Sequence, residues 1–274
     1  MSILQEMFTL QNGVKIPKIG FGTWQLPQSI AEETVCTAIE TGYRHIDTAI
    51  AYENERGVGA GIRKSGVPRE EIFVTSKIPA EIKSYEGAKK CVEESLDRLG
   101  VGYIDLMLIH APRPWWQMHA GLKTPYHKSN VAVWSALEEA YTAGKFRAIG
   151  VSNFAPSDLK NIEKNAKIQP MVNQIKAHAG KYPAALVGYC EEKGILVEGY
   201  SPLGTGKLLK NPNLKTLAEK YDATVPQLCV RFLLQKGVLP LPKTTHREYM
   251  AQNAAVDFQI SAEDMQKLEK IQKR

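Results

Sequence analysis

The sequence predicts an α/β fold, a (β/α)8 barrel with an N-terminal β-hairpin as a cap outside the barrel. Three observations support it: eight short apolar runs, helical patterns between them, and an Asn12-Gly13 turn signal inside "MFTLQNGVKIPK". No linker or long low-complexity segment interrupts the 274 residues, so a single domain over residues 1–274 is expected.

The eight predicted strands are nearly continuous apolar runs, as expected of strands that are covered on both faces. In chain order they are "IGFG" (19–22), "RHID" (44–47), "IFVTSK" (72–77), "IDLMLIH" (104–110), "FRAIGVSN" (146–153), "MVNQI" (171–175), "ILVEGYS" (195–201) and "VLPLPK" (238–243).

The segments between these runs have helical periodicity. "YEGAKKCVEESLDRL" and "VWSALEEAYTAG" are amphipathic, and the second ends in a Gly C-cap signal. "SAEDMQKLEKIQ" is a predicted closing helix, with Ser261 and Asp264 at capping-box spacing.

The competing fold is a doubly wound sheet, which needs a Gly-rich phosphate turn directly after a strand. "GVGAGI" (57–62) is the only candidate for such a turn. It follows no predicted strand, and Ile62 stands where the last glycine belongs. We therefore interpret it as a helix face of small residues.

Composition narrows the functional classes. Hydrophobic residues make up 43% of the chain and charged residues 23%, and no apolar run approaches the length of a membrane span. The net charge is +6; residues 205–274 hold 12 Lys and Arg against 7 Asp and Glu, but aromatic residues do not alternate with them, so no nucleic-acid partner is expected. No secretory signal is visible, and four scattered cysteines suggest reduced thiols in a cytoplasmic protein.

Polar side chains stand at the ends of most predicted strands. In a barrel of this type, chemistry gathers at the C-terminal ends of the strands. One such residue can be a helix cap, but a ring of them that includes Lys and His predicts a site. They are Asp47, Lys77, His110, Ser152, Asn153, Gln174, Tyr200, Ser201 and Lys243.

Asp47, Tyr52, Lys77 and His110 form a proton-transfer set. A phenol is a weak acid, and a nearby ammonium such as Lys77 is expected to lower its pKa. Asp47 can hold Lys77, and a neutral His110 can orient a carbonyl oxygen towards Tyr52. Such a set protonates an oxygen as hydride arrives at the carbon.

Two other chemistries are less compatible with these residues. An isomerase or aldolase barrel would need a Schiff-base lysine, but pairing with Asp47 keeps Lys77 charged and unreactive. The sequence predicts no metal-binding site, because the six histidines include no H-E-x-x-H pattern. His45, His119 and His127 are expected to be structural or exposed.

The chain resembles the aldo-keto reductases over nearly its whole length, most closely the bacterial diketogluconate-reductase type. The motifs that carry the resemblance are "GFGTW" (20–24), "GYRHIDTAIAYENE" (42–55), "TSK" (75–77), "LIH" (108–110), "AIGVSNF" (148–154), "NQI" (173–175), "YSPLGTGKLL" (200–209) and "LPKTT" (241–245). The resemblance implies a (β/α)8 TIM barrel, NADPH as the cofactor and reversible reduction of carbonyl groups on small molecules by a monomer.

The resemblance also implies roles for individual residues. Tyr52 would be the general acid, Asp47 and Lys77 would support it, and His110 would orient the substrate. Ser152, Asn153 and Gln174 would hold the nicotinamide carboxamide, and Tyr200 would stack on its ring. The remaining cofactor positions would be Gly22, Thr23, Asp47, Ser201, Leu203, Gly204, Lys243, Thr244, Thr245, Arg247, Gln252 and Asn253, and the substrate pocket would comprise Trp24, Tyr52, His110, Ala111, Trp115 and Trp116.

Three positions depart from the family pattern. Ala111 replaces a Trp after the histidine, and Lys176 replaces a Glu after "NQI". Tyr249 stands where an Arg usually reaches the adenosine 2′-phosphate, and Arg247 is its expected substitute. These changes affect the pocket shape and the preference for NADPH, and leave the four proton-transfer residues intact.

The long loop "APRPWWQMHAGLKTPYHKSN" carries Trp115 and Trp116. Loops of this length are usually functional or disordered. The loop is expected either to anchor itself to the barrel or to close on the substrate, with one Trp filling the space that Ala111 leaves. Some members of the family are cofactor-binding regulatory subunits, so a barrel with little turnover is the alternative to an enzyme.

Overall fold

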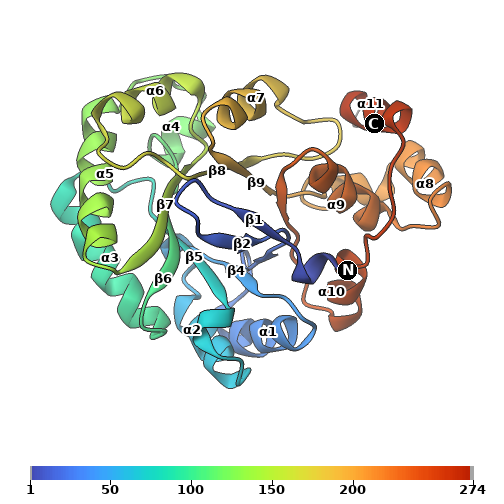
Figure 1. The fold of residues 1–274 in the computed structure, drawn as a ribbon, viewed down its shortest axis with the longest axis horizontal. Coiled ribbons are helices and arrows are strands. Elements are labelled where there is room, and N and C mark those ends of the chain that lie inside the picture. The colour runs from blue at the N-terminus through green and yellow to red at the C-terminus, as the bar shows by residue number, and fades with distance from the viewer. Residues whose placement is uncertain (1, 272–274) are drawn as a thin grey trace.

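The computed structural model describes residues 2–271, and its centre is a ring of eight parallel strands surrounded by helices (Figure 1). The strands β3 to β10 neighbour one another in chain order. The ring closes where the Gly20 N–H donates to the Pro240 carbonyl at 3.1 Å and the Gly22 N–H donates to the Pro242 carbonyl at 2.9 Å. The predicted (β/α)8 barrel is confirmed.

Each barrel strand lies on one of the predicted apolar runs. The strands are β3 Phe21–Gly22, β4 His45–Asp47, β5 Phe73–Ile78, β6 Ile104–Ile109, β7 Phe146–Ser152, β8 Val172–Lys176, β9 Leu196–Tyr200 and β10 Leu239–Leu241. The α-helices are α1 Gln28–Glu40, α2 Glu55–Lys64, α3 Tyr85–Leu99, α4 Trp115–His119, α5 His127–Thr142, α6 Pro156–Asn165, α7 Ala184–Glu192, α8 Pro212–Glu219, α9 Val225–Gln235, α10 Arg247–Ala254 and α11 Ala262–Lys270. Short 3-10 helices are η1 Ile3–Gln5, η2 Ile50–Tyr52, η3 Arg69–Glu71 and η4 Lys207–Lys210.

The outer helices begin and end at capping residues that the sequence supplies. The Ser84 side chain accepts a hydrogen bond from the Gly87 N–H at the start of α3, and Gly100 ends that helix in the left-handed conformation. Ser261 caps α11 as predicted. Asp264 does not complete the expected capping box, because its carboxylate accepts from the Tyr221 hydroxyl, which itself accepts from the Ser261 N–H.

The glycines of α2 permit close contact with its neighbours, as the small-residue interpretation of residues 57–62 predicted. A Cβ atom at Gly59 would lie 1.8 Å from the Leu99 carbonyl oxygen, and one at Gly61 would lie 2.5 Å from the Glu32 carbonyl oxygen. Helix α2 therefore packs directly against the backbone of α1 and the end of α3. It is not a phosphate-binding turn.

The predicted N-terminal hairpin consists of β1 Met7–Thr9 and β2 Lys15–Pro17. Its connection is longer than a two-residue Asn-Gly turn, because Thr9 pairs with Lys15 and only Gly13 has a positive φ, of 84°. The Asn12 side chain donates to the Arg147 carbonyl at 2.9 Å, at the beginning of β7. The hairpin therefore covers the N-terminal end of the barrel.

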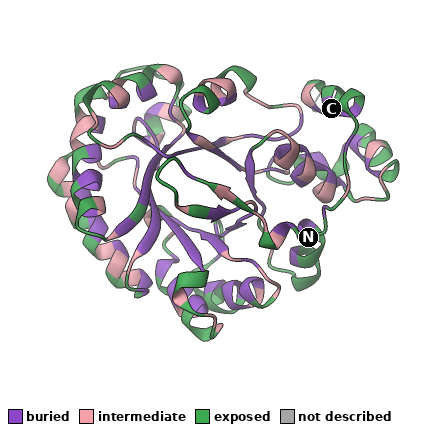
Figure 2. Cartoon of the chain, viewed as in Figure 1, coloured by how far each residue is buried: buried purple, intermediate pink, exposed green. Residues whose placement is uncertain are grey.

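The barrel interior has an apolar half and a polar half. Near the hairpin, Leu10 and Ile16 join an apolar cluster with inward side chains of the strands, including Phe73, Leu106 and Leu239. Further along the strands the buried side chains include polar ones, and Figure 2 shows that the barrel strands are largely buried while the outer helix faces are exposed. The hairpin covers one end, so the opposite rim, where barrels of this type have their active sites, is the open one.

Candidate active site

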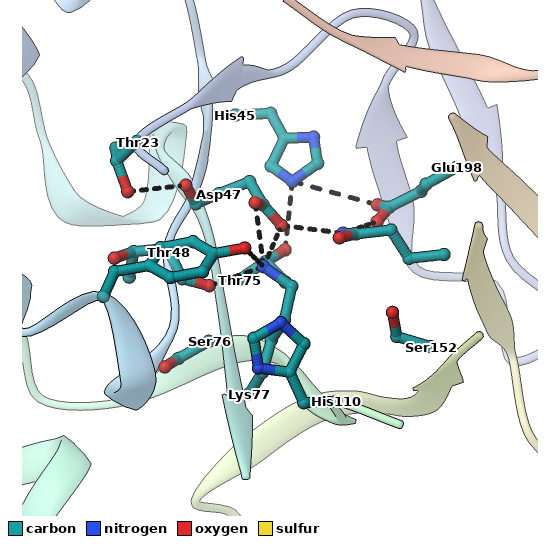
Figure 3. A network of polar contacts seen from close by, with 12 residues as sticks. Thr23, His45, Asp47, Thr48, Thr75, Ser76, Lys77, His110, Ser152 and Glu198 are labelled. Atoms are coloured by element: carbon teal, nitrogen blue, oxygen red, sulfur yellow. Dashed lines mark hydrogen bonds and ion pairs between the residues drawn. The ribbon is translucent and has the colours of Figure 1, made fainter. Parts of the chain in front are cut away.

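A buried ion pair between adjacent strands forms the base of the site. Asp47 ends β4, Lys77 lies on β5, and both side chains point into the barrel (Figure 3). The Lys77 ammonium donates to the two Asp47 carboxylate oxygens at 2.8 and 2.9 Å and to the Thr48 carbonyl at 2.7 Å. Burial lowers the pKa of Lys77, but Asp47 and Tyr52 outweigh it, so the pKa is raised overall and the lysine stays charged.

Tyr52 extends this ion pair towards the rim. It ends the 3-10 helix η2, which is followed by Glu53 in the left-handed conformation, with φ of 57°. The Lys77 ammonium lies 3.4 Å from the Tyr52 hydroxyl and 5.0 Å from the centre of its ring. Burial raises the pKa of the Tyr52 phenol. The Lys77 ammonium lowers it, as expected, but only partly opposes the burial, so the pKa is raised overall.

His110 follows β6 and faces Tyr52. The two ring centres are 5.7 Å apart in an edge-to-face arrangement. Burial, and secondarily the charge of Lys77, lower the pKa of His110 well below its ordinary 6.5. The imidazole is therefore neutral at physiological pH, as the sequence reasoning required.

A second carboxyl group, which the sequence motifs did not predict at the site, belongs to Glu198 on β9. It is fully buried and accepts a hydrogen bond at 2.7 Å from the amide nitrogen of Gln174 on β8. The same nitrogen donates to Asp47 at 2.7 Å. Burial, together with the charge of Asp47, raises the pKa of Glu198 to about 8. A polar residue within the apolar run 195–201 was the available signal.

Residues expected to hold the nicotinamide lie at adjacent strand ends. The Tyr200 hydroxyl donates to the Asn153 side-chain oxygen at 2.8 Å, and the Asn153 amide donates to Ser152 and to the His110 carbonyl. Asn153 and Ser201 have left-handed backbones, with φ of 61° and 53°, which is typical of residues held in place at functional sites. The Gln174 backbone carbonyl accepts from the Asn153 N–H at 2.9 Å. Its side-chain amide nitrogen is turned away from this group and donates to Asp47.

The residues expected near the adenosine phosphate surround the start of α10. Lys243, Thr245 and Arg247 are exposed, and the N-cap of α10, His246, makes no side-chain capping bond. Arg247 is paired with Glu40 of α1 at 3.1 Å. Among the other expected contacts, Gln252 and Tyr249 are exposed and Asn253 is buried.

Two loops supply the other expected cofactor contacts. Gly22 lies beside β10, where an added Cβ would come within 3.8 Å of the Lys243 Cβ. The Thr23 hydroxyl donates to the Asp47 carbonyl at 2.9 Å. Leu203 and Gly204 follow β9, and Gly204 adopts a φ of 58°. These loops therefore border the same rim as Asp47, Tyr52 and Lys77.

The tryptophans of the long loop occupy different environments. Trp115 packs edge-to-face on His110 with ring centres 5.2 Å apart, whereas Trp116 is 63% exposed. Trp24, after β3, is also exposed. Ala111 is fully buried, and its carbonyl accepts a hydrogen bond from Lys83, so this residue does not line an open pocket.

The same loop is anchored to the barrel at its base. The Trp115 N–H donates to the Glu81 side chain at 3.2 Å, and the Asn130 amide donates to the Pro112 carbonyl at 2.9 Å. Part of the loop forms the short helix α4. The anchoring interpretation thus has direct support, while closure on a substrate stays a prediction.

Residues 2–271 contain no group of three or more His, Cys, Asp or Glu that could hold a metal ion. The four cysteines are free and buried.

The three histidines expected to be structural or exposed are so. His45 is buried against Thr75, with 3.0 Å between the ring Nε2 and the hydroxyl, and His119 and His127 are exposed. Within the described helices, none is long and apolar enough to cross a membrane.

The chain matches the model of the aldo/keto reductase family over residues 18–273. It is 43% identical over 272 residues to the glyoxal reductase of Bacillus subtilis (strain 168), with 98% of this chain and 94% of that protein covered.

Solved structures agree. An aldo/keto reductase from Brucella melitensis has a TM-score of 0.89 at 34% identity, with 97% of each chain covered. The Bombyx mori aldo-keto reductase in complex with NADP has a TM-score of 0.86 at 33% identity, with 96% of this chain and 92% of that chain covered. The protein belongs to the aldo/keto reductase family of NADP(H)-dependent oxidoreductases, as the sequence motifs predicted.

Proposed function

We propose that the protein reduces aldehydes, ketones and keto-sugars to alcohols with NADPH, reversibly, and that Tyr52 is the general acid. The observation that carries the proposal is the chain of contacts from Asp47 through Lys77 to the Tyr52 hydroxyl. Asp47 and Lys77 are buried, whereas Tyr52 is partly exposed, so the chain of contacts ends at a phenol that a substrate can reach. The glyoxal reductase relative supports a small carbonyl compound as substrate.

In this reaction, side chains of the protein donate the proton and stabilise the charge that its transfer leaves behind. The raised pKa of Tyr52 keeps the phenol protonated, so it can donate to the carbonyl oxygen. The Lys77 ammonium then stabilises the phenolate that remains, and Asp47 holds the ammonium in place. Neutral His110 can donate a ring N–H to the carbonyl oxygen of the substrate, and it does not supply the proton that Tyr52 transfers. NADPH, when bound, supplies the hydride to the carbonyl carbon.

The residues present fit this cofactor. The start of α10 lacks a side-chain cap, so its first N–H groups are suitable partners for an anion. Lys243 and Thr245 stand exposed beside it and would hold the 2′-phosphate. At the other end, Ser152, Asn153 and Gln174 would hold the carboxamide, and the ring of Tyr200 would lie against the nicotinamide.

We expect Lys243→Ala to weaken NADPH binding far more than NADH binding. A charge-assisted hydrogen bond is worth about 1.5–3 kcal/mol, which corresponds to roughly ten- to a hundredfold in affinity. Fluorescence titration of both cofactors measures the difference. Lys90→Ala, on the exposed face of α3, is the matched control and should change neither affinity. If the native protein binds both cofactors equally, Tyr249 has removed the phosphate preference.

We expect Trp115→Ala to change the ranking of bulky and small carbonyl substrates. Its indole lies against His110, and a fully buried apolar contact of that size is worth about 1.5–3 kcal/mol. The expected change in relative kcat/KM is roughly ten- to a hundredfold. Trp116→Ala should have a smaller effect, because Trp116 is 63% exposed.

Steady-state kinetics on one small aldehyde and one bulky ketone test this prediction. The affinity for NADPH should barely change in either variant, since the expected phosphate contacts lie around β10 and α10. An unaltered ratio of kcat/KM in both variants would show that the loop is only an anchor.

The overall proposal is tested by NADPH and NADH consumption with a panel of aldehydes, ketones and keto-sugars, including a diketogluconate. We propose that the enzyme acts as a cytoplasmic monomer with one barrel domain, which size-exclusion chromatography checks for the oligomeric state. Binding of NADPH without turnover on any carbonyl would favour the alternative, a regulatory barrel subunit.

A further inference from the structure

The amide nitrogen of Gln174 is bound on two sides inside the barrel. It donates to an Asp47 oxygen and to a Glu198 oxygen, each at 2.7 Å. A side-chain amide nitrogen carries two hydrogens, so both are used. Gln174 is 2% exposed and Glu198 is fully buried, and the two residues pair directly across β8 and β9.

The contact with Asp47 determines which end of the amide faces the barrel interior. Both Asp47 oxygens accept from the Lys77 ammonium, so this carboxylate is ionised and can only accept. The Gln174 atom beside it must therefore be the nitrogen. If Asp47 were the only partner, the second hydrogen would remain free to turn towards a bound cofactor. Glu198 takes that hydrogen.

We propose that Glu198 is a positioning residue that commits the second amide hydrogen of Gln174, so that Gln174 can offer the nicotinamide carboxamide only its carbonyl oxygen. The inference rests on the proposed function, in which Gln174 contacts the carboxamide. The Gln174 carbonyl oxygen can accept a hydrogen bond from the N–H of a carboxamide. It can form no hydrogen bond with a ligand group that has only a carbonyl oxygen.

The surroundings of Glu198 fit this role. Its pKa of about 8 keeps the group largely neutral at physiological pH, so it accepts the hydrogen bond without adding a second charge beside Asp47. The charged or titratable groups around it are Asp47 and His45 on β4 and Lys77 on β5, and His45 lies 3.9 Å from its other oxygen. That oxygen has no hydrogen-bond partner among residues 2–271. Within this part of the chain, the Glu198 carboxyl group accepts its hydrogen bond from the Gln174 amide.

The experiment compares NADP⁺ with its 3-acetylpyridine analogue, in which an acetyl group replaces the carboxamide and no N–H remains. Dissociation constants are measured by protein fluorescence. The native protein should bind NADP⁺ about five- to tenfold more tightly than the analogue, the value of one hydrogen bond. Glu198→Leu should reduce this gap to within about twofold, because the freed Gln174 nitrogen can turn to the carbonyl oxygen of either ligand.

Glu198→Gln should retain the native gap, since its amide oxygen can accept the same hydrogen bond. If Glu198 were only structural, its replacement would weaken the binding of both ligands equally and leave the ratio of the two dissociation constants unchanged. Glu138→Gln, which alters a buried glutamate on α5, is the matched control and should keep the native ratio. If the leucine variant does not fold, Glu198→Thr replaces it, because the threonine hydroxyl is too short to reach Gln174.

Two results would overturn the inference. One is a native protein that binds both ligands equally well. The other is a folded leucine or threonine variant that keeps the native gap. In both cases carbonyl reduction by the native protein with NADPH would leave the proposed function standing, whereas a native protein that binds no NADP⁺ would refute both.

Discussion

Tyr52→Phe is expected to reduce the rate of carbonyl reduction by about 10²–10⁴-fold, the usual contribution of a positioned general acid. The phenylalanine ring keeps the shape of the tyrosine and removes the hydroxyl that lies 3.4 Å from the Lys77 ammonium. No other phenol is bonded to that ammonium among residues 2–271. Single-turnover rates with a small aldehyde measure the loss directly.

The fold and the cofactor affinity of this variant should be preserved, because the buried Asp47–Lys77 pair remains. Thermal unfolding and NADPH titration check both properties. Tyr85→Phe removes a phenol on the outer helix α3 and should leave the rate unchanged. Near-native turnover by Tyr52→Phe would mean that another group donates the proton.

Lys77→Met should damage both stability and activity. It leaves the Asp47 carboxylate, which is 4% exposed, without its cation. Breaking a buried ion pair in this way costs about 3–5 kcal/mol, or roughly 6–20 °C in Tm for a chain of this size. Turnover should also be largely lost, because nothing then stabilises the phenolate of Tyr52.

The double variant Lys77→Met with Asp47→Asn separates the two effects. Removing both charges leaves no isolated buried charge, so much of the stability should return. Activity should not return, because the ammonium is still missing. Calorimetry and initial rates on the three variants provide the comparison, and recovery of turnover in the double variant would contradict the role given to Lys77.

The sequence was sufficient to locate the strands and to predict that Asp47, Lys77 and His110 lie on one rim of the barrel. Each barrel strand is short, apolar and separated from the next by a helix, so its existence does not depend on distant contacts. Asp47, Lys77 and His110 stand at strand ends, and parallel strands bring such ends to one rim. The structure places these side chains and Tyr52 together, at the distances given above.

Other features depended on register and burial, which the sequence does not reveal. Glu198 lies inside an apolar run, and only its pairing with Gln174 shows that it is linked, through the Gln174 amide, to the buried Asp47–Lys77 ion pair. The direction of the Tyr52 pKa shift is set by the depth of burial, which outweighs the neighbouring ammonium. The hairpin connection is longer than the Asn-Gly signal indicated, because the Leu10 N–H donates to the Val14 carbonyl and residues 11–13 form the turn.

The N-terminal hairpin has a practical consequence for handling the protein. The hairpin lies across the end of the barrel opposite the candidate active site, with Leu10 and Ile16 buried in that end. A tag or surface linker joined ahead of this segment would leave the molecule on the side away from the rim. Protein attached to an electrode or resin through that linker should present its open face to the solution.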